Sequence, residues 1–188
     1  MPRLFSLLML LCLTVNAHAD SYISRTLNKP VPGGVAVVDL GSSAAAPKAT
    51  YQGKPLLVVK EQANWLAIVG IPLTVKPGNE RISSGGRNLP FIVGYKQYPE
   101  QRITLKNKSQ VNPAPAQLKR IEAELAVQIK AYRSFSPNQP SNLVLDKPVN
   151  GPLSSKFGVR RFFNGEERNP HSGLDFEIGR ASCRERVS

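Results

Sequence analysis

PLLVVKEQANWLAIVGI, Pro55 to Ile71, holds two short runs rich in β-branched and aromatic residues, PLLVVK and NWLAIVGI. Such side chains pack well on a pleated surface and favour strands. Similar runs flank this stretch: GVAVVDL at 34–40, PFIVGY at 90–95 and QRITL at 101–105. Turn signals separate the runs, at Gln52-Gly53, Pro77-Gly78-Asn79 and Ser84-Gly85-Gly86. We therefore predict a mainly β protein with a small antiparallel β N-terminal domain over residues 20–111, a sandwich or barrel. Trp65 fits its core or sheet surface better than a ligand platform.

A single helix is predicted over residues 112–134. It begins near Asn112-Pro113 and Pro115. Its apolar residues recur at three and four positions, which forms one stripe that we expect to pack against a neighbouring sheet or helix: Leu118, Ile121, Leu125, Ile129 and Tyr132. The polar, proline-containing stretch that follows predicts a linker over residues 135–145, and a second unit begins at residue 146.

The first 19 residues have the pattern of a secretory signal peptide. Arg3 precedes the apolar run Leu4 to Val15, and Ala17-His18-Ala19 offers small residues to a signal peptidase. Cleavage would leave Asp20 as the N-terminus and indicates export to the periplasm or cell envelope. A membrane anchor is the alternative, but the run is shorter than the roughly 20 residues that span a bilayer. A lipoprotein signal is disfavoured because Leu11 precedes Cys12.

Residues 178–188 differ in character from everything before them. The stretch IGRASCRERV carries four charges and no apolar period, and it resembles the translation of a sequencing-library adapter. We interpret it as an adapter-derived artefact, with a genuine charged tail as the alternative. The protein sequence is then expected to run to Phe176 or Glu177.

The positions of the cysteines and the net charge exclude several classes of function. Both cysteines, Cys12 and Cys183, lie in the two excluded stretches, so residues 20–176 offer no disulfide, thiolate metal site or thiol nucleophile. Residues 20–176 retain 21 of the 25 Lys and Arg and 11 of the 13 Asp and Glu, a balance of +10. Such a protein is drawn to anionic wall polymers or membrane surfaces, although a merely solvated basic surface is equally compatible. The basic residues are scattered, which argues against a specific nucleic-acid partner.

PHSGLDF, Pro170 to Phe176, places His171 and Asp175 four residues apart. Both side chains are good zinc ligands, and Gly173 would allow a tight bend between them. A catalytic zinc needs three protein ligands and an open position for water. The pair alone is therefore weak evidence, because a histidine beside an aspartate is usually only a hydrogen-bonded pair.

The residues that precede this pair strengthen the prediction of a metal site. PLSSKFGVRRFFNGEERNPHSGLDF, residues 152–176, resembles the opening of the lysostaphin/LytM-type zinc metallopeptidases, which are peptidoglycan endopeptidases. That family begins its catalytic domain with Ser-x-Phe-Gly-x-Arg, here Ser155 to Arg160, and continues to His-x-Gly-x-Asp, here His171 to Asp175. The run YPEQRITLKNKSQVNP, residues 98–113, and the helix after it also resemble the N-terminal domain of exported members.

The resemblance implies a function and a site. It implies that His171 and Asp175 bind zinc as the metal ligands, that zinc-bound water attacks the amide carbonyl, and that the substrates are peptides of peptidoglycan. The family's third ligand is the last His of a downstream His-x-His. This chain contains only His18 and His171, so it has no His-x-His.

The missing histidines predict a fragment. We expect residues 146–177 to be the truncated start of an antiparallel β peptidase domain, inactive and unable to hold stoichiometric zinc. Its aromatic residues are expected to be exposed for lack of partner strands: Phe157, Phe162, Phe163 and Phe176. The alternative is a non-catalytic wall-binding or hydrolase-activating protein.

Overall fold

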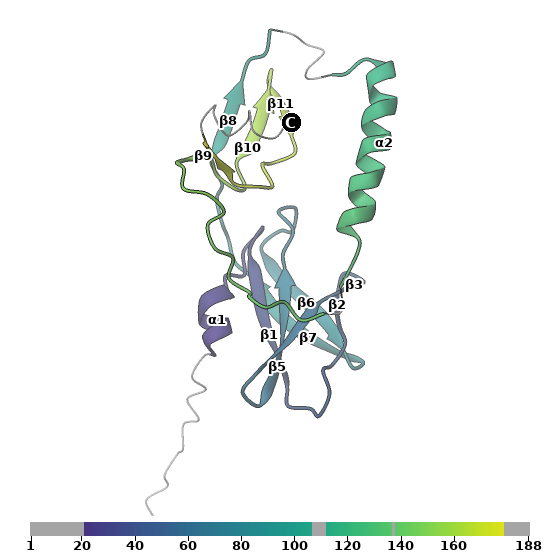
Figure 1. The fold of residues 1–188 in the computed structure, drawn as a ribbon, viewed down its shortest axis with the longest axis vertical. Coiled ribbons are helices and arrows are strands. Elements are labelled where there is room, and N and C mark those ends of the chain that lie inside the picture. Colours follow the sequence, from purple (N-terminus) through teal and green to yellow (C-terminus); the bar gives the residue numbers. More distant parts are fainter. Residues whose placement is uncertain (1–20, 107–111, 137, 179–188) are drawn as a thin grey trace, which may run out of the picture.

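The computed structural model describes residues 21–106, 112–136 and 138–178. The predicted signal peptide and residues 179–188 of the adapter-like stretch lie outside them. The described residues are mainly β, with antiparallel sheets and few helices, which confirms the predicted fold class. Figure 1 shows the larger group of strands at one end of the molecule, the smaller group at the other, and α2 to one side.

Two antiparallel sheets make up the N-terminal unit. One has the strand order β1-β5-β4 and the other has the order β3-β2-β6-β7. The bounds are Val35–Gly41 for β1, Ala49–Tyr51 for β2, Lys54–Pro55 for β3, Leu57–Glu61 for β4, Asn64–Gly70 for β5, Gly78–Ser84 for β6 and Arg87–Val93 for β7.

The core lies between these two sheets, because both contribute side chains to one buried cluster. Along β1 the buried residues alternate, which is the period of a strand with one face toward a core. Ile82, Val69 and Val93 are its largest fully buried side chains. The rest of the cluster comprises Ala36, Val38, Leu40, Ala49, Tyr51, Val58, Ala67 and Ile71. Trp65 packs on the edge of this core and donates from Nε1 to the carbonyl of Ser43 at 2.9 Å.

Tight turns set the register of the hairpins. Gly85 and Gly86 both have positive φ, 56° and 76°, between β6 and β7, as a two-residue hairpin loop of the type I′ class requires. The predicted turn at Pro77-Gly78-Asn79 is wrong in extent, because β6 begins at Gly78.

Helix α1, Tyr22–Leu27, was not predicted, so the expectation of a single helix is wrong. Ser21 caps it by accepting from the backbone of Ser24 at 3.1 Å, and the backbone of Ile23 donates to the Glu61 carboxylate. Neither helix among the described residues is long and apolar enough to cross a membrane.

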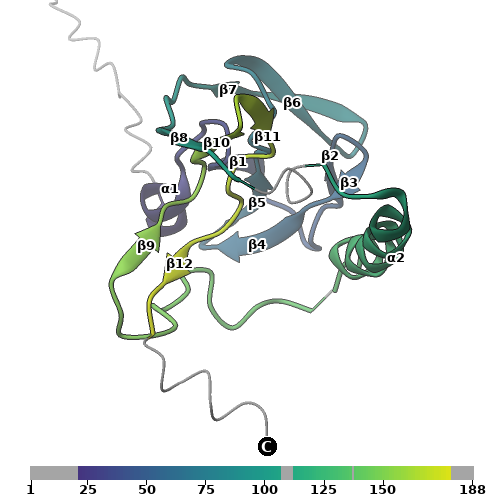
Figure 2. The same ribbon diagram turned by 90° about the horizontal axis from the view of Figure 1, so that it is seen from above.

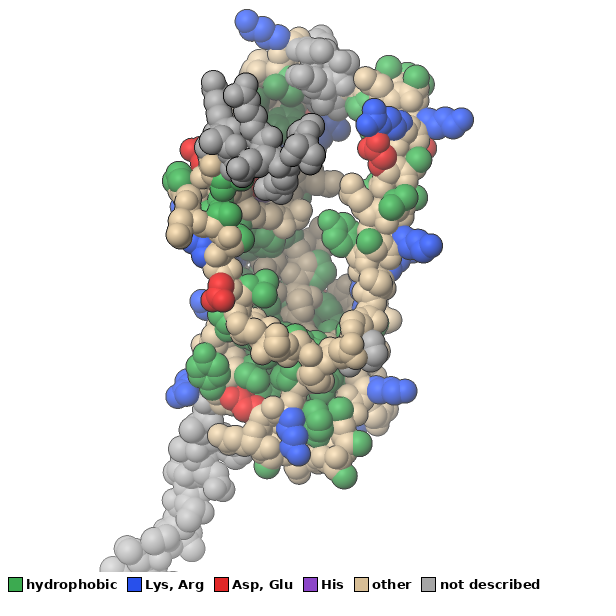
Figure 3. All heavy atoms as spheres, viewed as in Figure 1, with side chains coloured by type: hydrophobic (Ala, Val, Ile, Leu, Met, Phe, Trp, Pro, Cys, Tyr) green, Lys and Arg blue, Asp and Glu red, His purple; other side chains and the backbone are tan. Residues whose placement is uncertain are grey.

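Helix α2, Pro115–Tyr132, forms where the apolar period predicted a helix, but it buries none of its residues. The predicted packing of its stripe is therefore wrong for the described residues. Figure 2 shows α2 standing beside the sheets, and the space-filling view in Figure 3 shows a hollow between it and the rest of the molecule. The stripe residues are 38% to 85% exposed: Leu118, Ile121, Leu125, Ile129 and Tyr132.

The smaller group of strands joins distant parts of the sequence. A three-stranded sheet has the order β11-β10-β8, and β8 runs parallel to β10. A two-stranded sheet pairs β12 with β9. The bounds are Glu100–Ile103 for β8, Leu153–Ser155 for β9, Arg160–Phe163 for β10, Glu166–Arg168 for β11 and Asp175–Phe176 for β12. The strand predicted at 101–105 as part of the first domain thus pairs with the last unit.

The aromatic side chains of the last unit are not exposed as expected. Phe162 is buried, and Phe157, Phe163 and Phe176 are half-buried. The guanidinium groups of Arg102 and Arg160 lie 4.2 Å and 5.2 Å from the ring of Phe162. Strand β8 therefore supplies cover that the sequence of the last unit alone does not contain.

Candidate functional site

His171 and Asp175 come together at the start of β12. His171 lies in the loop before this strand and Asp175 is the first residue of the strand. Nε2 of His171 lies 3.2 Å from Oδ1 of Asp175. The side chain of His171 is 11% exposed and that of Asp175 is 52% exposed, so the pair opens to solvent on the aspartate side.

The bend between the two residues does not depend on glycine. Gly173 is absent from the residues with positive φ, and a Cβ built on it would lie 3.8 Å from Nε2 of His171, an ordinary contact. The expectation that Gly173 supplies a special backbone bend is therefore wrong.

The segment Ser155 to Val159 contacts the backbone of His171 and the Nδ1 side of its ring, away from Asp175. The backbone N–H of Gly158 donates to the His171 carbonyl at 2.7 Å, and the His171 N–H donates to the carbonyl of Val159 at 2.9 Å. On the side chain, Nδ1 lies 3.0 Å from the carbonyl of Lys156 and 3.0 Å from Oγ of Ser155. Both the main chain and the ring of His171 are thus fixed by one short segment.

The role of each ring nitrogen depends on the tautomer of His171. With the hydrogen on Nδ1, that nitrogen donates to the carbonyl of Lys156, and the unshared pair of Nε2 faces the carboxylate of Asp175. With the hydrogen on Nε2, that nitrogen donates to Asp175 and Nδ1 accepts from the hydroxyl of Ser155. In the first tautomer, Nε2 and the carboxylate are two acceptors that a metal cation between them would satisfy.

A zinc ion fits this pair as two of its ligands. Two ligands of a tetrahedral zinc at about 2.0–2.2 Å from the metal lie about 3.3 Å or slightly more from each other. The observed separation of 3.2 Å between Nε2 and Oδ1 is close to that distance. Within residues 21–106, 112–136 and 138–178, no group of three His, Cys, Asp or Glu side chains could hold a metal. The described residues thus fit part of a zinc site.

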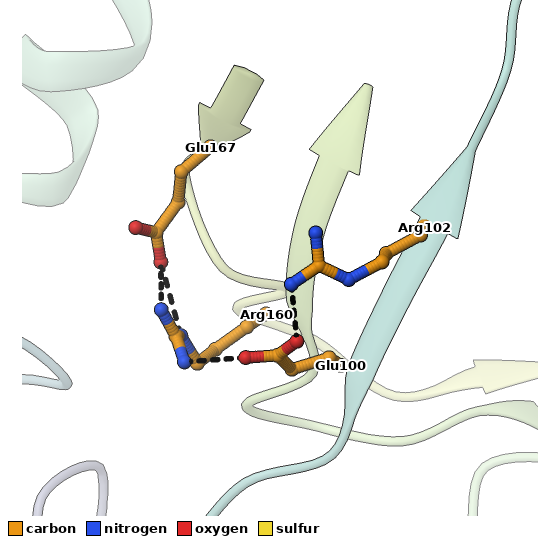
Figure 4. Close-up of polar contacts among 4 residues, drawn as sticks. All are labelled: Glu100, Arg102, Arg160 and Glu167. Atoms are coloured by element: carbon orange, nitrogen blue, oxygen red, sulfur yellow. Dashed lines mark hydrogen bonds and ion pairs between the residues drawn. The ribbon is translucent and has the colours of Figure 1, made fainter. Parts of the chain in front are cut away.

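An ion-pair network lies on the neighbouring sheet and ties three strands together (Figure 4). Arg160 on β10 donates to Glu100 on β8 at 2.7 Å and to Glu167 on β11 at 2.8 Å. Arg102 donates to the other oxygen of Glu100 at 2.8 Å. The hydrogen bond that Arg160 donates to Glu167 raises the pKa of the Arg160 guanidinium.

A cavity of about 560 Å³ lies beside this network, between the two groups of strands. Its wall comes from both, with Pro32 and Leu73 from the first and Gly158, Arg160 and Pro170 from the second. Tyr98 lines it from the connecting segment.

The Ser-x-Phe-Gly-x-Arg motif pointed to these supporting residues without revealing what they do. Ser155 contacts the His171 ring, Gly158 binds the His171 carbonyl, and Arg160 joins the strands. Tyr98 and Glu100 belonged to the resembling run at 98–113, but no sequence pattern placed them beside the motif.

Comparison with known proteins gave a family match, similar solved structures and one negative result. Residues 28–96 match the model of the peptidase family M23 N-terminal domain. A crystal structure from Pseudomonas aeruginosa, of a protein assigned to peptidase M23, is similar with a TM-score of 0.66 and 51% sequence identity. The similarity covers 84% of this chain and 59% of that chain, so this chain spans about three fifths of the relative. No curated protein sequence matched.

Proposed function

Because this chain belongs to peptidase family M23, we propose that it is part of an exported zinc metalloendopeptidase that hydrolyses peptide bonds of peptidoglycan. Family membership indicates a peptidase. The metal, the substrate and the location in the periplasm or cell envelope are our proposals. They are supported by the predicted signal peptide, the basic charge and the two linked motifs of the last unit.

One observation carries the proposal. Nε2 of His171 and Oδ1 of Asp175 lie 3.2 Å apart, while Nδ1 of the same ring is engaged by the carbonyl of Lys156. A histidine that donates its second nitrogen to a carbonyl is the usual arrangement around a protein metal, because this contact fixes both the tautomer and the ring orientation. We propose that His171 and Asp175 bind zinc.

The residues of this chain would hold and orient the metal. Bound zinc would supply a water of pKa about 7 and polarise the scissile carbonyl. Lys156 and Ser155 keep the His171 ring in one orientation, and the pairing of β12 with β9 places Asp175 opposite Ser155. Two ligands do not complete a zinc site, so we propose that the 188-residue chain alone is inactive.

The test compares this chain with a version extended after Phe176 by the His-x-His segment of a lysostaphin-type peptidase. We expect the extended version to bind one zinc per chain and to release soluble peptides from purified peptidoglycan. His171→Ala and Asp175→Asn in the extended version should abolish both. The unextended chain should show neither, as measured by equilibrium dialysis with metal analysis and by assay of released amino groups.

A matched control removes a carboxylate elsewhere in the same unit. Asp146 is exposed, and Asp146→Asn in the extended version should leave zinc binding and hydrolysis unchanged. Full activity without His171 would overturn the proposed role of the pair. If the extended version is inactive but accelerates another wall hydrolase, the protein is a non-catalytic activator instead.

A further inference from the structure

We propose that Tyr98 is a positioning residue for His171: its ring holds the turn that fixes the histidine and ties that turn to the first β unit. The importance of this positioning for catalysis rests on the proposed zinc role of His171. The physical claim itself concerns the tautomer and backbone of His171, which can be measured without a metal.

Tyr98 is anchored to the first unit at one end. Its hydroxyl donates to the carbonyl of Pro32 at 2.7 Å. The next residue, Gly33, has a φ of +73°, and a Cβ there would lie 3.0 Å from the Tyr98 hydroxyl oxygen. The backbone of Pro32 and Gly33 thus approaches the phenol closely, and the ring is half-buried.

The other side of the ring lies against the motif of the second unit. A Cβ on Gly158 would lie 2.0 Å from Cε1 of Tyr98, so only glycine allows the ring to contact this backbone. Gly158 also has a φ of +83°, which favours glycine independently. The ring of Phe157 meets Tyr98 edge-on, with centroids 6.3 Å apart.

The contact with Gly158 continues directly to His171. Gly158 donates its N–H to the His171 carbonyl, and its neighbour Val159 accepts from the His171 N–H. The Lys156 carbonyl that faces Nδ1 of His171 lies two residues before Gly158. Tyr98 therefore covers the middle of the segment that supplies the main-chain contacts of His171.

A second contact holds the same segment. The backbone N–H of Arg160 donates to the carbonyl of Pro99 at 2.9 Å, directly after Tyr98. The turn at residues 156–160 is thus fixed at its centre by a ring and at its end by a hydrogen bond. Without the ring, the centre of the turn keeps only its main-chain hydrogen bonds to His171, which no side chain then supports.

Loss of the ring should loosen His171 without removing any of its own partners. The hydrogen bonds at Lys156, Gly158 and Val159 remain chemically possible but lose the support that aligns them. A typical hydrogen bond contributes about 0.5–1.5 kcal/mol net, so we expect local opening of the segment to rise by about twofold to tenfold.

The test uses NMR on the metal-free chain. His171 is the only histidine after His18, so its imidazole nitrogens give a readily assigned pair of ¹⁵N signals. The protein should show one predominant tautomer. In Tyr98→Ala we expect a mixture of both tautomers and about twofold to tenfold faster amide exchange at Gly158 and His171.

Two further variants separate positioning from general stability. Tyr98→Phe keeps the ring on Gly158 and should retain the single tautomer. Tyr95→Ala is the matched control, because Tyr95 lies on the same connecting segment and is 76% exposed. It should leave His171 unchanged. Protection of the Ile82 amide reports whether the first unit stays folded in each variant.

Gly158→Ala provides an independent route to the same change if Tyr98→Ala does not fold. Its methyl group would displace the Tyr98 ring while leaving the tyrosine present. An unchanged tautomer and unchanged exchange in a folded Tyr98→Ala or Gly158→Ala variant would overturn the inference. Those results do not depend on hydrolysis, so they are distinguishable from a failure of the proposed zinc role.

Discussion

Tyr51 is a core tyrosine whose hydroxyl keeps a polar partner. Its hydroxyl donates to Oε2 of Glu80 at 3.1 Å, and its ring meets Phe91 edge-on. Burial, followed by the hydrogen bond and charge of Glu80, raises the pKa of Tyr51 above its usual value. The folded protein therefore favours the neutral phenol, which an unfolded chain would lose near pH 10.

We predict that Tyr51 makes stability depend on alkaline pH. Its contribution is fully present below about pH 10 and is lost as the pH rises toward and through the raised folded pKa. The free energy of unfolding should therefore fall more steeply above pH 10 in the unchanged protein than in Tyr51→Phe, as measured by urea denaturation at several pH values. Tyr22 is 65% exposed, so Tyr22→Phe should keep the steep fall. Equal slopes for all three proteins would show that Tyr51 titrates like a free phenol.

At the residue scale, the sequence predicted the pair His171 and Asp175 but not the residues that hold it. His171 and Asp175 were recognisable because a short motif carries both. The partners of the His171 ring, Ser155 and Lys156, lie 16 and 15 residues earlier, and a hydrogen bond over that distance has no local pattern. Glycine is needed at position 158 of the motif because the Tyr98 ring lies against its backbone, a contact that the sequence does not indicate.

Helix α2 carries an exposed apolar stripe, whereas strand β6 contributes a single apolar side chain to the buried core. Leu125 on α2 is 48% exposed, whereas Ile82 on β6 is 1% exposed. We predict that Leu125→Lys changes the free energy of unfolding by no more than about 0.5 kcal/mol. Ile82→Ala should lower it by about 2–5 kcal/mol, because it leaves a cavity in the core. Chemical denaturation of both variants checks the pair of values.

A loss of more than about 1 kcal/mol in Leu125→Lys would show that the stripe packs against something in solution. Helical content by circular dichroism is the accompanying control. Arg120 and Glu124 form an ion pair at 2.7 Å on the same helix, and Lys at position 125 should leave that pair and the helix intact.

At the element scale, the sequence pattern predicted which segments form helices or strands better than it predicted which other segments pack against them. The apolar period of α2 indicated a helix, but a period cannot say whether a partner exists. Strand β6 was missed because its sequence, GNERISS, contains a single apolar residue that points to the core. It forms because β7 pairs with all seven of its residues.

At the scale of the whole molecule, we predicted two separate units from the sequence, whereas in the structure a strand from the first predicted unit pairs with a strand of the last. Residues 101–105 were recognisable as a strand, yet β8 pairs with β10, whose first residue lies 60 positions after the first residue of β8. Nothing local to either strand specifies a parallel partner across a helix and a linker. Glu100 and Arg160 supply the specific contact once the strands meet.

The basic surface gives a prediction for the molecule as a whole. Residues 20–176 carry a balance of +10, and we expect them to bind anionic vesicles in a sedimentation assay. Binding should weaken strongly between about 0.05 M and 1 M salt, because the screening length falls to about 3 Å at the higher value. Vesicles of zwitterionic lipid are the control and should retain little protein. Binding to neither vesicle type would mean that the charge is merely solvated, and equal binding to both would mean that charge does not drive the binding.

The parallel pairing of β8 with β10 also orders events in time. A chain that emerges N-terminus first, from a ribosome or from an export channel, presents the strands of the first two sheets by Val93, so those sheets can form early. Strand β8 follows within ten residues but must wait for Arg160 before its neighbour exists. During that interval it is an unprotected edge on a nascent polypeptide, open to pairing with another chain. A pause in the emergence of the chain between these strands would therefore favour aggregation, and faster emergence there would suppress it.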